Sequence, residues 1–227
     1  ACICLGRAHS SSLCQSEPMR ILRIPKNSTL ALCSFDTELG TITCAASGGA
    51  LSALWMSGQR FFGYPFGISE AEAASPADLS SANGLHAWAL DGSTVSDQNA
   101  AVLEQTYQWT QKFLTGTNPS PSTIPLATYG TDFQLRVWNA LLDIPYGECV
   151  TYADLAREVG SPRAYQAVGS TVGHNPLSLI VPCHRVASAS GQVHYGGGPA
   201  RKLYLLSLES GEASAICSAT RSSSTGN

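Results

Sequence analysis

Three residues that can carry out chemistry follow one another in the stretch SLIVPCHRVAS, residues 178–188: the thiol of Cys183, the imidazole of His184 and the guanidinium of Arg185. A cysteine is a strong nucleophile only as a thiolate, and its pKa falls beside a histidine or a helix N-terminus. The alternative is that Cys183 only fills the core, a common role for cysteine. His184 and Arg185 argue against that alternative, because both need partners when they are buried. The stretch therefore predicts a nucleophilic cysteine at a functional site.

The elements before Cys183 are predicted to position it. The apolar run LSLIVP, residues 177–182, indicates a buried strand. Neighbours on a strand point to opposite faces, so Pro182 is expected to bend the chain and turn Cys183 and His184 toward one cavity. Ahead of this run, TYADLAREVG predicts a helix capped by Thr151 and ended by Gly160.

A second short helix is expected in SPRAYQAVGSTVGHN, with Ser161 and Pro162 as its N-cap and first turn. Two short helices joined by a tight turn have the shape of a helix-turn-helix motif. Further helices are predicted at 131–142 and 200–210, where apolar residues recur at helical spacing.

The first half of the chain has a different character. Residues 29–47 alternate apolar and small polar side chains and predict a hairpin, with ALSALWMS as a third strand. A long loop is expected at about 64–100, followed by an amphipathic helix at 99–116. The proline-rich segment 117–130 is interpreted as a linker.

Length and composition limit the class of protein. The chain has 227 residues, 44% of them hydrophobic, which suffices for one large domain or two small ones. No apolar stretch approaches the roughly 18 residues needed to cross a bilayer, and the start lacks the pattern of a secretory signal. A cytoplasmic protein is expected, or a nuclear one if the source is eukaryotic. The net charge of −3 counts against nucleic-acid binding unless a specific motif outweighs it.

The eight cysteines form no regular framework and no CxxC pair, so free thiols in a reducing compartment are predicted. A zinc site made of Cys2, Cys4, Cys14 and His9 is the alternative, although its spacing is poor. No cofactor is therefore expected. Residues 1–20 are interpreted as an N-terminal tail and residues 212–227 as a disordered one.

Four runs between Thr131 and Glu209 occur together and in order: FQLRVWNALLDIPYGECVTYADLA, AVGSTVGHNP, IVPCHRV, and YGGG followed by RKLYLLSLE. They closely resemble the catalytic domain of the O6-alkylguanine-DNA alkyltransferase family. DTELGTITCAASGGALSALWMSGQ resembles the N-terminal domain of that family more loosely. The resemblance implies an α/β (α+β) protein. Its N-terminal domain, 21–120, would be a small antiparallel sheet with a helix, ribonuclease H-like. Its catalytic domain, 126–211, would be mainly helical and winged helix-turn-helix-like.

The resemblance also implies a single turnover of covalent chemistry. Cys183 would attack the alkyl carbon on guanine O6 and keep the alkyl group, with O4-alkylthymine as a second candidate substrate. His184 would draw off the thiol proton through a water, and Glu209 would orient His184, which is physically sensible for a Cys–His–carboxylate set. Tyr152 would protonate guanine N3, and Asn175 would brace the turn before the active-site strand.

The partner implied is double-stranded DNA, bound by a monomer through the minor groove with the damaged nucleotide flipped out. The second helix, 164–174, would enter the groove. Gln166 stands where the family commonly has an arginine finger, and Arg163 on roughly the same helical face could supply charge. The implied DNA-binding positions are Thr151, Arg163, Ala164, Gln166, Ala167 and Gly169. The implied base pocket consists of Val172, Val186, Tyr195 and Gly196, bordered by a short loop with His194.

Three other functions compete with repair. A lesion-binding relative that flips the base without repairing it would have another residue in place of Cys183. A helix-turn-helix regulator would need base-reading polar side chains on its second helix, which here is rich in Ala, Val and Gly. A cysteine hydrolase would need an oxyanion hole, for which the sequence gives no sign.

Overall fold

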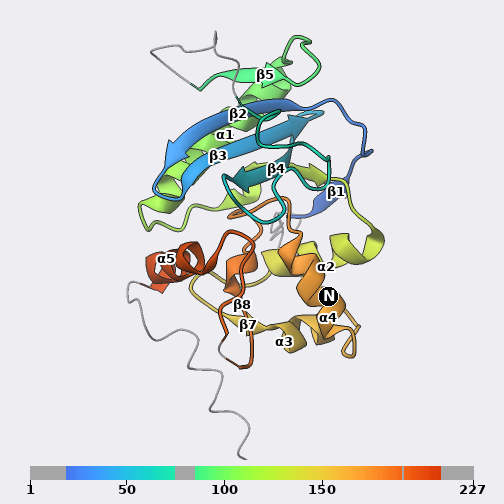
Figure 1. Ribbon diagram of the computed structural model, residues 1–227, viewed down its shortest axis with the longest axis vertical. Coiled ribbons are helices and arrows are strands. Elements are labelled where there is room, and N and C mark those ends of the chain that lie inside the picture. Colours follow the sequence, from blue (N-terminus) through green and yellow to red (C-terminus); the bar gives the residue numbers. More distant parts are fainter. Residues whose placement is uncertain (1–18, 75–84, 191, 211–227) are drawn as a thin grey trace, which may run out of the picture.

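The computed structural model describes residues 19–74, 85–190 and 192–210. The candidate zinc ligands and both tails, except Met19 and Arg20, lie outside these residues. A sheet with one long helix forms the first half of the protein, and shorter helices lie below it (Figure 1). Within the described residues, no helix is both long and apolar enough to span a membrane.

A three-stranded meander forms the centre of the sheet: β2 (Ala31–Thr37), β3 (Gly40–Ser47) and β4 (Ala50–Met56). The antiparallel register places Cys33 opposite Cys44, which confirms the predicted hairpin and third strand. The turns close on glycines with positive φ, as at Gly48 and Gly49, where other residues would be strained.

Three short strands complete the sheet: β1 (Ile21–Arg23), β5 (Ala87–Ala89) and β6 (Leu126–Thr128). The order is β1-β6-β4-β3-β2-β5, and β6 runs parallel to both β1 and β4. The sheet is therefore mixed, whereas a purely antiparallel one was predicted. β5 lies in the predicted long loop and β6 in the predicted linker, which also holds the 3₁₀ turn η2 (Pro121–Thr123). Strands of three residues show no periodicity, and only their partners reveal them.

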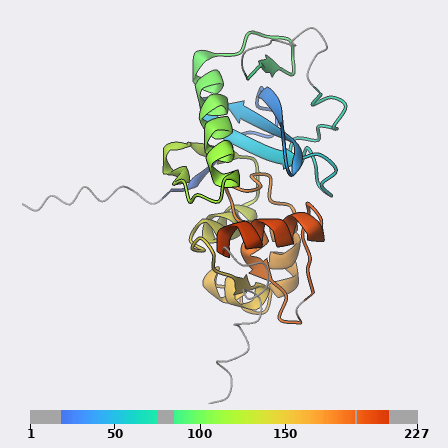
Figure 2. The ribbon, with the colours of Figure 1, turned by 90° about the vertical axis from the view of Figure 1, so that its left-hand side faces the viewer.

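Helix α1 (Asp97–Leu114) covers one face of the sheet, and the segment after β4 covers the other (Figure 2). Helix α1 begins two residues before the predicted start because Ser96 caps it, accepting a hydrogen bond from the Asn99 N–H. On the opposite face Trp55 packs against Phe62 and Phe66. Both faces of the sheet are thus buried.

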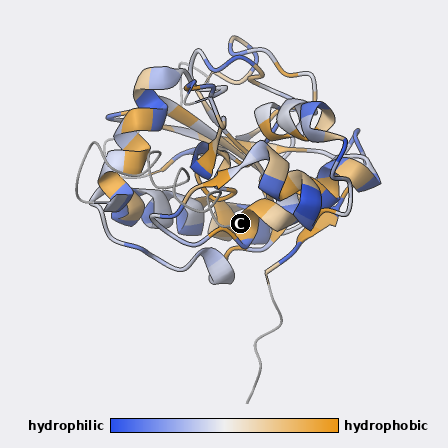
Figure 3. Ribbon diagram, turned by 90° about the horizontal axis from the view of Figure 1, so that it is seen from below, coloured by the Kyte–Doolittle hydropathy of each residue, from blue (hydrophilic) through white to orange (hydrophobic). Residues whose placement is uncertain are grey.

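The second half contains α2 (Asp132–Leu142), α3 (Tyr152–Glu158), α4 (Tyr165–Gly173), α5 (Pro199–Ser210) and a two-stranded sheet of β7 (Val150–Thr151) and β8 (Val186–Ala187). Its helices carry polar and apolar bands along the ribbon, as amphipathic helices do (Figure 3). Capping boxes at Thr131 and Thr151 start α2 and α3. The combination of a sheet half and a mainly helical half confirms the predicted fold class, and α3 and α4 form the predicted helix-turn-helix.

The start of α4 differs from the prediction. Ser161 does not cap it, because α4 starts four residues later, and the Ser161 N–H closes the end of α3 by donating to the Ala156 carbonyl (2.8 Å). α4 begins at Tyr165, after a residue that makes no side-chain cap. Arg163 consequently lies in the turn before the helix, and its predicted helical spacing with Gln166 is wrong.

Candidate active site

The segment that leads to Cys183 is a buried loop, which corrects the predicted strand. Leu177 makes one isolated bridge to Leu54 of β4, and Leu179 then takes a left-handed backbone conformation with φ 69°. Cys183 itself begins a 3₁₀ turn, η3 (Cys183–Arg185). The run is apolar because it is buried against the sheet, and not because it pairs as a strand.

Asn175 adds side-chain hydrogen bonds to the two backbone hydrogen bonds that this loop makes with Leu54 of β4. Its Oδ1 accepts from the Leu177 N–H (3.0 Å), and its Nδ2 donates to the Val181 carbonyl (2.8 Å). The same Nδ2 lies 3.1 Å from the Cys183 Sγ and donates to it. One buried amide thus holds the loop in shape and points a donor at the sulfur.

The Cys183 thiol is protonated in this setting. Burial raises its pKa, while the Asn175 hydrogen bond and the charge of Lys202 lower it in part. Lys202 is a buried cation whose Nζ donates to the Val186 carbonyl (2.6 Å) and the His194 carbonyl (3.2 Å). A base is therefore needed before Cys183 can act as a nucleophile.

His184 is suited to be that base. Its side chain is fully buried, and its Nε2 lies 2.8 Å from Glu209 Oε1. Burial lowers the pKa of His184 although Glu209 acts to raise it, so the ring is neutral at neutral pH. Burial alone would raise the pKa of Glu209, but hydrogen bonds from His184 and Arg185 lower it to about 2.

The tautomer of His184 follows from this pairing. An ionised Glu209 accepts, so Nε2 carries the hydrogen and Nδ1 has the free lone pair. Nδ1 is buried and has no hydrogen-bond partner among the residues that the structure describes. The imidazole therefore presents an unused acceptor inside the protein.

Arg185 completes the set and was assigned no role from the sequence. Its Nε and Nη2 form a fork on the Glu209 carboxylate, at 2.9 and 2.8 Å, and its Nη1 donates to the Ile144 carbonyl (2.6 Å). The Gly147 N–H also donates to Glu209 (3.1 Å). The position of Arg185 directly after Cys183 and His184 could have indicated a functional role. Its partner Glu209 lies 24 residues further along the chain, so neighbouring residues do not predict the pairing.

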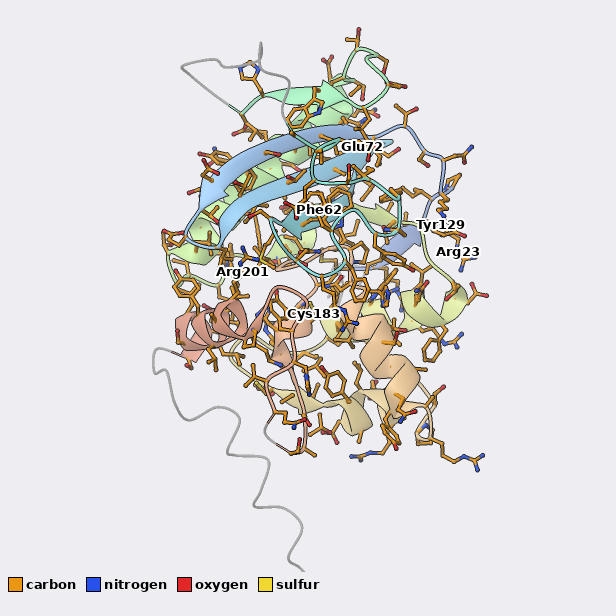
Figure 4. The ribbon with its side chains drawn as sticks, viewed as in Figure 1. Arg23, Phe62, Glu72, Tyr129, Cys183 and Arg201 are labelled. Atoms are coloured by element: carbon orange, nitrogen blue, oxygen red, sulfur yellow. The ribbon has the colours of Figure 1, made fainter. Side chains whose placement is uncertain are left out.

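A cavity of about 540 Å³ opens onto Cys183. Cys183 lies at the junction of the two halves (Figure 4). Its walls come from α3, α4, the loop before α5 and the segment after β4. The residues that line it are Arg60, Phe61, Tyr152, Gly169, Ser170, Val172, Gly173, His174, Cys183, His194, Tyr195 and Gly196. Arg60 and Phe61 were not predicted there, since only the fold brings that segment to the cavity.

The predicted pocket residues Val172, Tyr195 and Gly196 line this cavity, and Val186 does not. Val186 is buried in β8 with its carbonyl bound by Lys202. The Tyr195 hydroxyl is buried and has no hydrogen-bond partner of good geometry within the described residues. Burial, and then the charge of Cys183, raise the pKa of Tyr195 well above its ordinary value.

Except for Thr151, the predicted DNA-binding positions lie on or beside α4. Gln166, Ala167 and Arg163 are exposed, whereas Ala164 is partly covered and Gly169 lines the cavity. Thr151 caps α3 by exchanging hydrogen bonds with Asp154. No group of three or more residues that could hold a metal ion occurs in the described part of the chain.

Replacing Asn175 with alanine is expected to raise the pKa of Cys183, because the sulfur loses its hydrogen-bond donor. The buried Leu177 N–H would also lose its acceptor, which should cost about 1–3 kcal/mol of unfolding free energy. The rate at which iodoacetamide labels Cys183, followed by peptide mass from pH 6 to 11, measures the pKa. An Asn118→Ala change at an exposed position is the control. Equal titration curves for the two variants would remove Asn175 from this role.

Known proteins resemble this chain in both sequence and structure. The profile of the 6-O-methylguanine DNA methyltransferase DNA binding domain matches residues 132–211. The crystal structure of Mycobacterium tuberculosis OGT in complex with DNA superposes with a TM-score of 0.59 and is 34% identical, over 78% of this chain and 91% of that one. The chain belongs to the O6-alkylguanine-DNA alkyltransferase family.

Two members of this alkyltransferase family match part of the chain. A methylated-DNA–protein-cysteine methyltransferase of Mycobacterium tuberculosis is 55% identical over 93 residues, which is 40% of this chain and 56% of that protein. An inducible one from Bacillus subtilis is 48% identical over 88 residues, or 38% of this chain and 49% of that protein. The sequence match thus spans about half the length of these relatives.

Proposed function

We propose that the protein repairs alkylated DNA by transferring the alkyl group of O6-alkylguanine to Cys183, once and irreversibly. The observation that carries this proposal is the buried Cys183 thiol at the wall of a cavity, with a neutral His184 next in the chain and a Glu209 carboxylate behind it. The family relationship supports the same chemistry. The substrate class is alkylated duplex DNA, with O4-alkylthymine as a second candidate.

The reaction begins with proton removal from Cys183. The lone pair on His184 Nδ1 accepts that proton through a water molecule, and Glu209, ionised because its pKa is about 2, stabilises the imidazolium formed at Nε2. Arg185 and the Gly147 N–H hold the carboxylate in place. The base is thus oriented by groups that do not touch the substrate.

The thiolate then attacks the alkyl carbon in line with the bond to guanine O6. The sulfur–carbon bond forms as the carbon–oxygen bond breaks, and the electron pair passes into the guanine ring. Tyr152, which lines the cavity, gives its proton to N3 so that guanine leaves as a neutral base. The pKa of Tyr152 is raised, first by burial and then by the charge of Cys183, so the hydroxyl carries a proton to give. The product is a thioether that the protein does not reverse.

The target atom lies inside the duplex, so the nucleotide must leave the stack to reach Cys183. α4 offers small or short side chains, Ala167 and Gly169 among them, that permit close approach to a minor groove. Gln166 is exposed and takes the place of the intercalating arginine. The protein is expected to act as a monomer in the cytoplasm, with itself as the alkyl acceptor.

The test is incubation with a duplex containing O6-methylguanine, followed by intact mass and peptide mapping. A gain of one methyl group per chain on the peptide that contains Cys183 is the expected result. Duplex binding without any gain in mass at long times would overturn the proposal and identify a lesion-binding protein.

Replacing Tyr152 with phenylalanine is expected to lower the single-turnover rate of methyl transfer about 10²-fold at saturating duplex, because N3 loses its proton donor. Quenched-flow sampling with mass detection measures this rate. Tyr204→Phe on α5, where the tyrosine is 36% exposed, controls for the loss of a hydroxyl. A Tyr152→Phe rate equal to that of wild type would show that the proton comes from elsewhere.

A further inference from the structure

The segment after β4 is fixed against the active-site half of the protein. The Arg60 N–H donates to the Gly196 carbonyl (2.9 Å), which belongs to the loop before α5. The buried Gln59 side chain accepts from the Met56 N–H (2.9 Å), and the Trp55 Nε1 donates to the Tyr64 carbonyl (3.0 Å). The backbone around Arg60 is therefore held at the edge of the cavity.

A stack of side chains also holds Arg60 beside α4. The guanidinium lies over the Phe61 ring at 5.1 Å, and that ring stacks on the imidazole of His174 with centroids 3.7 Å apart. His174 follows the last residue of α4, and its Nδ1 lies 2.7 Å from the Ser170 carbonyl. Tyr64 contacts the same imidazole edge-on at 5.0 Å. The charge of Arg60 is thus placed by contacts with the helix that is proposed to enter DNA.

The charge of Arg60 is not neutralised by the protein. The residue is exposed and forms no ion pair within the described ranges, 19–74, 85–190 and 192–210. The cavity lining that it shares with Cys183 contains no aspartate or glutamate. The Glu70 carboxylate accepts from the Gly58 N–H (2.8 Å) and forms no ion pair with Arg60. A permanent cation at the rim of a cavity without acidic residues is suited to bind an anion.

We infer that Arg60 binds the phosphodiester next to the nucleotide that enters the cavity, so that the N-terminal half forms part of the DNA-binding surface. This inference rests on the proposed function, because the rim of the cavity meets the sugar-phosphate backbone only if a base occupies the interior. A guanidinium at this rim would supply charge that the neutral Gln166 cannot. Its donors match two phosphate oxygens, and its stacking on Phe61 leaves them free to point outward.

The test measures duplex binding as a function of salt in proteins that also carry Cys183→Ala, so that no alkyl group moves. Arg60→Gln is expected to reduce the slope of log affinity against log salt by about 0.9, the contribution of one phosphate contact. The loss of affinity should then be about three- to fourfold greater at 50 mM than at 200 mM salt. Arg60→Lys should keep most of the slope, because the charge remains.

Lys112→Gln is the matched control, since it removes one exposed positive charge from α1 on the other side of the sheet. Equal slopes for Arg60→Gln and Lys112→Gln would overturn the inference, even if the wild-type protein gains a methyl group. A reduced slope confined to Arg60→Gln would support the phosphate contact, and it would do so even if methyl transfer by the wild type failed. Thermal unfolding of each variant checks that the substitution leaves the protein folded.

Discussion

Replacing Cys183 with serine is expected to abolish methyl transfer from O6-methylguanine DNA, a loss of about 10⁴-fold or more. Serine keeps the size of the side chain and can still accept the Asn175 hydrogen bond, so the buried loop should stay intact. Its hydroxyl has a pKa far above the range of His184, and no strong nucleophile forms. Intact mass after long incubation with the duplex measures the result.

The control for this change is Cys149→Ser, at a partly buried thiol outside the residues that line the cavity. That variant should gain one methyl group as wild type does. Methyl transfer by Cys183→Ser, with the label on another cysteine, would show that the nucleophile has been misassigned. Duplex binding by Cys183→Ser, measured alongside, separates loss of chemistry from loss of binding.

Replacing Glu209 with glutamine should both destabilise the protein and slow the reaction. The Arg185 guanidinium would stay buried without its carboxylate, which should lower the unfolding free energy by about 3 kcal/mol. The imidazolium of His184 would lose its counter-charge, so methyl transfer should fall about 10²-fold. Urea unfolding and single-turnover kinetics measure the two effects.

The pH dependence of stability gives a second measure of Glu209. Its pKa falls from an ordinary 4.5 in the unfolded chain to about 2 in the folded protein. A lowered carboxyl pKa stabilises the fold above pH 4.5, and that contribution disappears as pH falls toward 2. Glu209→Gln should therefore show a shallower loss of stability over this range than wild type. Glu148→Gln, at an exposed carboxylate, should keep the wild-type slope; equal slopes in all three proteins would contradict the pKa argument.

Elements with a strong local pattern were predictable from the sequence. The hairpin of β2 and β3, the helices α1 and α2 and the capped helix α3 carry their periodicity and caps within a few residues. The Cys–His–Arg triplet likewise predicted a functional site, since two polar residues beside a buried thiol need partners. Local chemistry was sufficient for these conclusions because both the signal and its cause lie in adjacent residues.

Elements that depend on distant partners were not predictable in this way. The three-residue strands β1, β5 and β6 exist only because β2, β4 and each other offer hydrogen bonds, and the apolar run before Cys183 has the composition of a strand. It is a loop because it makes only one isolated bridge to β4, while the Asn175 side chain binds the Leu177 N–H and the Val181 carbonyl.

By itself, the sequence was sufficient to predict that Cys183 is a nucleophile with His184 beside it and a helix-turn-helix in front of it. Only the tertiary structure decided that Glu209 accepts from both His184 and Arg185, and that Arg60 reaches the rim of the same cavity. The physical reason is distance along the chain. Residues from β4 to α5 become neighbours only when the buried core of both halves forms, and a single sequence carries no local record of such pairs.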